Sequence, residues 1–280
     1  HPHRIRPFRA LRLGRHFRAA IRFLRHMRRK SQLPAVGTVG QGDTYTALTS
    51  PSDEEATYSP SKRGGTEDLT FEMIRNDDVG AIRRIPVKLA RAAGHTLYEF
   101  VFDFIKDNSN IYDASALFTA GHGNLGSTAL AAAELEAAIN VMRNQTVAGS
   151  SKAMGAVNMP KFMLIPNELF RAAWELVTST VKIVSNDNAS TPNFFTQYGV
   201  NLIVLDYWTD ANNWYLVADP KNVPTIEIGF LDGREEPELF VQDQETVGSV
   251  FTADKVTYKI RHIYGGAVLD YRGFYGELVA

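Results

Sequence analysis

The uneven distribution of charge constrains this chain more than any other feature of its sequence. Residues 1–30 carry ten Arg and one Lys and no acidic residue. The rest of the chain holds 19 basic and 31 acidic side chains, a formal charge of −12, although the whole chain of 280 residues carries only −1. Charge separated in this way predicts a basic tail attached to an acidic body.

The basic tail has the pattern of a partly amphipathic helix. Apolar residues recur there at the three- and four-residue spacing of one helical face, which comprises Phe17, Ala20, Ile21, Leu24 and Met27. The candidate basic contacts on and beyond the opposite face are Arg15, Arg18, Arg22, Arg25, Arg28 and Arg29. Such a tail can contact nucleic acid, dock on acidic surfaces of neighbouring subunits or remain solvated, and phosphate neutralisation needs charge rather than a fixed fold.

Composition narrows the classes of protein that the acidic body can belong to. The chain contains no cysteine, which excludes disulfides and thiolate metal sites and favours a cytoplasmic origin. No run of eighteen apolar residues occurs, so no membrane span is expected. Hydrophobic residues make up 44% of the chain, enough for a sizeable core.

Residues 31–68 are rich in Gly, Ser, Thr, Pro and Asp and cannot bury enough apolar surface to fold alone. So long a structureless loop is uncommon in a compact domain unless it is functional. We expect an extended hairpin that leaves through Tyr45–Leu48, has a polar tip near Ser50–Glu55 and returns through Thr66–Met73. A disordered linker is the alternative interpretation.

A long helix is expected next. Apolar residues continue at helical spacing from Ile82 to Ile105, and Pro86 lies early enough to mark the start or a kink near it. Asn76, Asp77 and Asp78 offer caps for this helix.

Helices and strands then mix without a repeating strand–helix–strand rhythm, which predicts an α+β fold. The further helices are expected at 129–144 and, capped by Asn167, at 168–178. The predicted strands are 161–166, 200–205, 214–218, 226–231, 255–263 and 267–271, with a turn at 210–213. Residues 185–196 are expected to form a polar loop.

No pattern of catalytic residues is present, so we predict that the chain is not an enzyme and has neither cofactor nor metal. The glycines of Gly121-His-Gly-Asn124 could cradle phosphate, but no Lys-Ser/Thr pair follows, and a loop with positive φ angles explains them better. The histidines are scattered without metal-ligand spacing, and Glu235–Glu236 fits a solvated turn. The tryptophans Trp174, Trp208 and Trp214 are expected to be core or interface anchors.

The order of elements and four local patterns resemble the major capsid proteins of tailed phages with the Hong Kong 97-type fold, and most of all the Mu-type major head subunits. The stretches that carry the resemblance are Phe71–Pro86, Leu117–Leu125, Lys161–Leu169, and Trp214–Pro220 with Ile226–Gly233 and Tyr264–Gly273. They lie in the family's order, and the resemblance covers residues 42–276.

The resemblance implies four functional parts. They are an N-terminal arm (1–41), an extended loop (42–70), a peripheral domain (71–150 and 220–263, with a spine helix at about 79–107) and an axial domain (151–219 and 264–280). Family members commonly lose an N-terminal segment to a prohead protease, which suits a chain that begins at His1. Some relatives crosslink a loop lysine to a neighbour, but no partner for Lys62 can be identified.

The implied partners are other copies of the chain in pentamers and hexamers of an icosahedral shell in the virion. Portal, scaffold and prohead protease act during assembly in the bacterial cytoplasm, and double-stranded DNA is packaged inside. The loop residues expected to contact a neighbouring subunit are Tyr45, Asp53, Glu54, Glu55, Lys62 and Arg63. Two alternatives remain from the residues alone: a DNA-binding protein with a basic arm on an acidic globular body, and a hydrolase whose site is assembled from distant residues.

Overall fold

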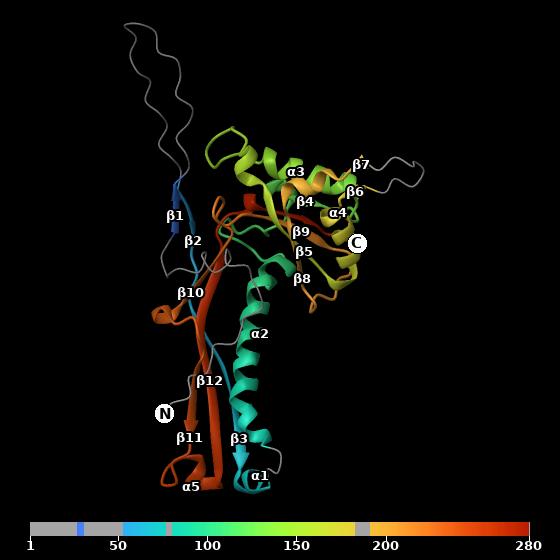
Figure 1. Cartoon of the computed structure of the whole chain (residues 1–280). Helices are drawn as coiled ribbons and strands as arrows, with labels where there is room; N and C mark the ends of the chain where they lie inside the picture. Colours follow the sequence, from blue (N-terminus) through green and yellow to red (C-terminus); the bar gives the residue numbers. More distant parts are fainter. Residues whose placement is uncertain (1–26, 31–52, 77–79, 183–190, 280) are drawn as a thin grey trace, which may run out of the picture. The chain divides into compact units, whose positions relative to one another are not determined.

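The computed structural model describes residues 27–30, 53–76, 80–182 and 191–279 of the chain (Figure 1). These residues form two compact units. Unit 1 contains Tyr58–Phe104 and Ile228–Ala267, and unit 2 contains Ile105–Glu227, the end of the chain from Val268, and a short ladder formed before Tyr58. The arm, loop, peripheral and axial domains inferred from the resemblance are functional divisions and stay predictions.

Unit 1 is built around one long central strand. Strand β12 (Lys255–Val268) pairs antiparallel with β3 (Ser61–Thr70) along ten residues and with β11 (Glu238–Gln242) along five. Strand β10 (Ile226–Phe230) joins the same four-stranded sheet. In β12, Ile260, His262 and Tyr264 are buried, whereas Lys259 on the other face is exposed. This alternation confirms the half-buried antiparallel strand predicted from the sequence.

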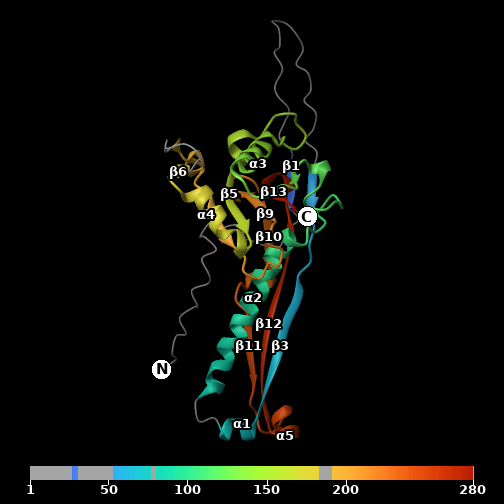
Figure 2. The same cartoon turned by 90° about the vertical axis from the view of Figure 1, so that its right-hand side faces the viewer.

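The long helix α2 (Ile85–Lys106) runs beside this sheet in both views (Figures 1 and 2). A 3-10 helix, Ala81–Arg84, leads into it from Gly80, whose φ of 65° lies in the left-handed region that glycine adopts at low cost. Pro86 is therefore the second residue of α2, where its missing N–H leaves no helical hydrogen bond unmade. The prediction of a long helix that begins near this proline is confirmed.

Two short helices meet at one end of unit 1. They are α1 (Phe71–Arg75), which follows β3, and α5 (Ser249–Ala253), which precedes β12. The backbone N–H of Phe71 donates to the carbonyl of Asp254 at 3.0 Å, which ties the two ends together. Asn76 lies at the C-terminal cap of α1, so the prediction that it caps the start of the long helix is wrong. Asp77 and Asp78 lie outside the described residues.

Unit 2 contains a five-stranded sheet in the order β4–β13–β9–β5–β8. Its strands are β4 (Leu125–Gly126), β5 (Pro160–Ile165), β8 (Asn201–Val204), β9 (Trp214–Ala218) and β13 (Phe274–Glu277). All five residues of β9 are buried, because both faces of the sheet are covered. Strand β13 lies between β4, to which it is parallel, and β9, to which it is antiparallel.

Two helices supply the core on one face of that sheet. Helix α3 (Ala132–Asn144) buries Leu135, Ile139 and Met142, and α4 (Phe170–Thr178) buries Ala173 and Val177. These side chains pack with strand residues including Met163, Ile165, Trp214 and Leu216. The predicted helices 129–144 and 168–178 and the predicted strands 161–166, 200–205 and 214–218 are confirmed, with shifted bounds. The predicted strand 267–271 is wrong, because β12 ends at Val268 and Tyr271–Gly273 forms a 3-10 helix before β13. A second correction concerns Asn167. That residue opens a 3-10 turn (Asn167–Leu169) instead of capping α4, whose N-cap is Leu169.

Two small ladders complete the described structure. Strand β6 (Val181–Lys182) pairs with β7 (Thr191–Pro192), and β1 (Met27–Lys30) pairs antiparallel with β2 (Asp53–Ala56). Met27 was predicted on a helical face and Asp53–Glu55 in a polar tip, and both predictions are wrong because these residues form the two strands. The remaining short 3-10 helices are Ala120–His122, Gly155–Asn158, Phe194–Tyr198, Leu231–Gly233 and Tyr271–Gly273.

Candidate subunit interface

The loop around His122 is fixed by contacts with several parts of unit 2. His122 is half-buried, with Nε2 2.7 Å from Asp113 Oδ2 and Nδ1 3.1 Å from the Leu117 carbonyl, and its ring stacks on Tyr271. Burial opposes ionisation of Asp113, but the hydrogen bond with His122 prevails and lowers the pKa of that carboxyl. Gly123 has a φ of 62°, so the explanation of this motif by a positive φ angle is confirmed.

Asn124, the last residue of the motif, is fully buried and uses its whole amide. Its Nδ2 donates to the carbonyls of Leu117 at 2.9 Å and Tyr271 at 3.4 Å, and its Oδ1 accepts from the Thr119 N–H at 3.2 Å. The motif therefore connects its loop to the 3-10 helix Tyr271–Gly273 by hydrogen bonds and does not form a phosphate-binding loop.

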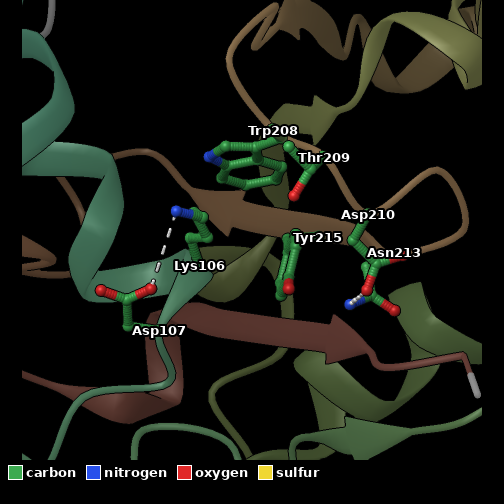
Figure 3. A pocket seen from close by; sticks show the side chains of 7 residues that line it. All are labelled: Lys106, Asp107, Trp208, Thr209, Asp210, Asn213 and Tyr215. Carbon is green, nitrogen blue, oxygen red and sulfur yellow. Dashed lines mark hydrogen bonds and ion pairs between the residues drawn. The ribbon is translucent and has the colours of Figure 1, made fainter.

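A hollow in unit 2 has a volume of about 160 Å³ and is lined by the seven residues shown in Figure 3. Ligand pockets usually measure about 300–1,000 Å³. Its charged groups already interact, since Lys106 Nζ lies 3.9 Å from Asp107 and Asp210 accepts from Asn213 at 2.6 Å. Burial, together with the Asp210 charge, raises the pKa of Tyr215 to about 12. Within the described ranges, no group of three His, Cys, Asp or Glu side chains could hold a metal ion.

Unit 1 contains a buried aromatic and cationic cluster on the face of the sheet toward α2. The guanidinium of Arg63 lies 4.3 Å from the ring centre of Phe100 and 4.2 Å from that of Tyr264, and it donates to the Tyr264 carbonyl at 2.9 Å. His262 faces Arg63 in the ladder, is 6% exposed and stacks on Phe230. Neither ring nitrogen of His262 has a hydrogen-bond partner among the described residues. Burial, aided by the nearby Arg63 charge, lowers the pKa of His262.

The structure places the predicted contact residues in three different settings. Glu55 and Lys62 are exposed in β2 and β3. Arg63 is half-buried, and its guanidinium contacts unit 1 itself. The register of β1 and β2 sets basic residues of the predicted arm opposite acidic residues of the predicted loop: Arg28 faces Glu55, Arg29 faces Glu54 and Lys30 faces Asp53. The remaining candidates lie outside the described residues: Arg15, Arg18, Arg22, Arg25 and Tyr45.

Two groups of exposed apolar residues were not predicted. The group in unit 1 comprises Phe71, Met73 and Ile74 of α1, Leu239, Phe240 and Val241 of β11, and Val247 and Phe251 near and in α5. Single exposed apolar residues are common on protein surfaces, but three consecutive ones in a strand form a contiguous apolar patch, which usually marks an interaction site. The sequence signal was present in Leu239-Phe-Val241, but this segment was not recognised as a strand.

A second exposed group is aromatic and belongs to unit 2. Phe170 and Trp174 lie one turn apart on α4, 45% and 49% exposed, beside the stripe of Ala173 and Val177 that faces the core. Trp208 and Trp214 are buried. Two tryptophans are therefore core residues, and Trp174 is a surface anchor without a covering element in the described part of the chain.

Exposed apolar surfaces of this kind are what a protein that binds copies of itself needs. A family model described as phage capsid protein matches residues 53–276, more than half of the chain. The chain belongs to this phage capsid family. It is thus a structural protein of the virion capsid, and the family implies self-association into a shell.

Solved phage structures share the fold. The chain resembles a structure titled Microbacterium phage Oxtober96 (TM-score 0.60, 13% identity, covering 94% of this chain and 89% of that one). It also resembles one titled Mycobacterium phage Bobi (0.60, 14%, 95% and 90%) and the capsid of Myoviridae phage XM1 (0.55, 11%, 90% and 83%). The predicted α+β class is confirmed, and the fold agrees with the Hong Kong 97-like type. Comparison with curated proteins finds no match. Within the described residues, no helix is long and apolar enough to cross a membrane.

Proposed function

We propose that this chain is the major head protein of a tailed bacteriophage and assembles into the pentamers and hexamers of an icosahedral shell around double-stranded DNA. The proposal rests on one combined observation. The chain belongs to the phage capsid family, and both units have apolar surfaces that no described element covers. Burial of such surfaces is the main driving force of protein association.

The two units supply different contacts in this proposal. Residues 151–219 and 264–280, which include the exposed Phe170 and Trp174, would meet their copies around five- and six-fold centres as an axial domain. Residues 71–150 and 220–263 would form the peripheral domain. Within the proposed arm and loop (1–41 and 42–70), the β1–β2 ladder has three oppositely charged register pairs, and the exposed Glu55 and Lys62 remain the best candidates to reach a neighbour.

The finer assignments rest on the resemblance. The chain would belong to the Mu-type branch of the Hong Kong 97-type capsid proteins and would have no catalytic role. It would assemble in the host cytoplasm with portal, scaffold and prohead protease, and the packaged DNA would lie on the inner face of the shell. The alternative of a DNA-binding protein with a basic arm gains no support, because Arg28 and Arg29 face acidic positions in β1–β2.

Trp174 provides a direct test of assembly. Of the three tryptophans it alone is exposed, so its transfer into an apolar interface must shift the fluorescence emission to shorter wavelength while Trp208 and Trp214 report no change. We expect the full chain, concentrated and followed by negative-stain microscopy, to form rings or shells as this shift develops.

The matched control is Trp174→Phe, which keeps an aromatic anchor but must lose the shift. A Trp208→Phe control must retain it. A protein that remains monomeric at every concentration and salt would refute the proposed function, and shells without a Trp174 shift would remove α4 from the interface.

A further inference from the structure

Among the residues that the structure describes, strand β11 forms an open edge of the unit 1 sheet. It pairs with β12 on one side and ends the strand order on the other. Leu239, Phe240 and Val241 are 42%, 39% and 46% exposed. An edge strand presents unpaired backbone N–H and C=O groups, and proteins usually protect it with charges, proline or a bulge. Residues 239–242 contain no charge and no proline.

The apolar side chains of β11 are divided between its two faces. Leu239 and Val241 face Ile260 and Tyr258 in the register with β12, so they lie on the face that carries the buried Tyr264. Phe240 lies on the opposite face, with the Lys259 ammonium 4.6 Å and the Arg261 guanidinium 4.9 Å from its ring centre. A partner strand at this edge would therefore find apolar side chains on both faces.

The one charge in β11 is already compensated. Glu238 accepts from Arg261 Nη2 at 2.6 Å and Nε at 2.9 Å, and it also pairs with Arg234. The strand therefore approaches a partner as a nearly neutral five-residue segment, which lowers the electrostatic cost of bringing two identical copies together.

The sequence of β11 is complementary to itself in one antiparallel register. If two copies pair about a two-fold axis through Phe240, Phe240 faces Phe240, Leu239 faces Val241 and Glu238 faces Gln242. Every apolar residue then faces an apolar residue, and no like charges lie directly opposite each other. Isologous pairing of this kind is the commonest way in which identical chains associate.

We propose that β11 is an interface between two copies of this chain, joined across a two-fold axis into a continuous antiparallel sheet centred on Phe240. The proposal rests on the self-assembly proposed above and names the element that makes one of its contacts. Main-chain hydrogen bonds between the two edges would supply affinity, and the apolar side chains would fix the register.

The absence of cysteine allows a clean test by disulfide trapping in the full chain. Residues directly opposite in an antiparallel pair have Cα atoms about 4.5–5.5 Å apart, within the range of a disulfide. We expect Phe240→Cys, treated with a mild oxidant under assembly conditions, to give a covalent dimer on a non-reducing gel. Its yield should exceed that of Val247→Cys by about tenfold, because paired thiols have a high effective concentration. Val247 is similarly exposed but lies outside the strand.

A second pair of variants checks the register without altering Phe240. Leu239→Cys and Val241→Cys should each crosslink poorly alone, since like positions are diagonal neighbours about 7–8 Å apart. Mixed in equal amounts, they should give a heterodimer. Crosslinked peptides that join residues 238–242 to any other segment would overturn the proposal.

The outcomes also separate this inference from the proposed function. Shells that assemble without dimers from Phe240→Cys or from the mixture would refute the β11 interface and leave the capsid function intact. Covalent dimers without rings or shells would support the interface and count against the capsid function.

Discussion

The buried His262 in strand β12 should make unit 1 sensitive to acid. The neutral imidazole packs against Phe230 and Tyr264, whereas an imidazolium there would carry a buried charge that faces the guanidinium of Arg63. Polar contacts with the backbone of Glu235 and Arg234 favour the charged imidazole and raise its pKa, but burial, the largest effect, prevails and the pKa of His262 is lowered. Arg63 is thus the principal charge that opposes protonation.

The sign and size of the effect follow from linkage. Because the folded-state pKa of His262 is lowered, its contribution to stability is complete above the ordinary histidine value of 6.5 and is lost as pH falls from there through the folded pKa. One proton is involved, so the free energy of unfolding can fall by at most about 1.4 kcal/mol per pH unit on this account.

Substitution of His262 by Phe should remove this sensitivity. An apolar ring of similar shape leaves no unpartnered nitrogen, so stability near neutral pH should be unchanged or higher. None of the three tryptophans lies in unit 1, and amide hydrogen exchange of β3 and β12 between about pH 7 and pH 5, corrected for intrinsic exchange, is therefore the suitable measurement. The control is His95→Phe on α2, where the imidazole is largely exposed and the acid dependence should persist. Equal acid dependence in wild type and His262→Phe would refute the reasoning.

Three further predictions concern the other packing features. Asn124→Ala should lower the free energy of unfolding of unit 2 by about 2–4 kcal/mol, measured by denaturation with tryptophan fluorescence, because three hydrogen bonds are lost inside the core; a loss below about 1 kcal/mol would contradict it. Gly276→Ala should cost about 1–3 kcal/mol in the same assay, since its Cβ would lie 2.9 Å from the Phe118 and Tyr215 rings; Gly121→Ala in the same unit, where the nearest atom to the added Cβ is Thr119 Oγ1 at 3.8 Å, is the control. Reversing Glu55 to Lys should speed amide exchange in β1 and β2, and the matched change of Arg28 to Glu should restore protection if the register pairs interact.

Local patterns predicted most elements of the fold. The start of α2 is fixed by Gly80 and Pro86, which act within a few residues, and the alternation of β12 reflects one buried face. The misses share a non-local cause. Strand β13 is only four residues long, contains Gly276 and is held between partners about 60 and 150 residues away in sequence, which no local pattern reveals. The sequence predicts helix at β1 because the strand forms only through pairing with β2, more than twenty residues away.

The contact surfaces were harder to predict than the fold. Exposure depends on what the rest of the chain leaves uncovered, and Leu239, Phe240 and Val241 read as ordinary apolar residues until their strand is known to be an edge. Trp174 could be assigned to core or interface from its type alone, but its exposure decides between them only once α4 is placed against Ala173 and Val177. Arg63 shows the opposite difference: it is a charged residue in a polar segment and was expected at the surface, but its guanidinium packs against the rings of Phe100 and Tyr264.

The two sheets differ in where their exposed apolar residues lie, and this difference bears on function. In unit 2 every residue of the central strand β9 is buried, and the exposed aromatic residues Phe170 and Trp174 lie on α4, outside the sheet. In unit 1 no residue of β11 is buried, although three of its five residues are large and apolar. A sheet that lacks cover at its edge gains order when another chain supplies it. The elements of unit 1 at this edge are therefore the ones whose stability must depend most on whether the chain stands alone or among its copies.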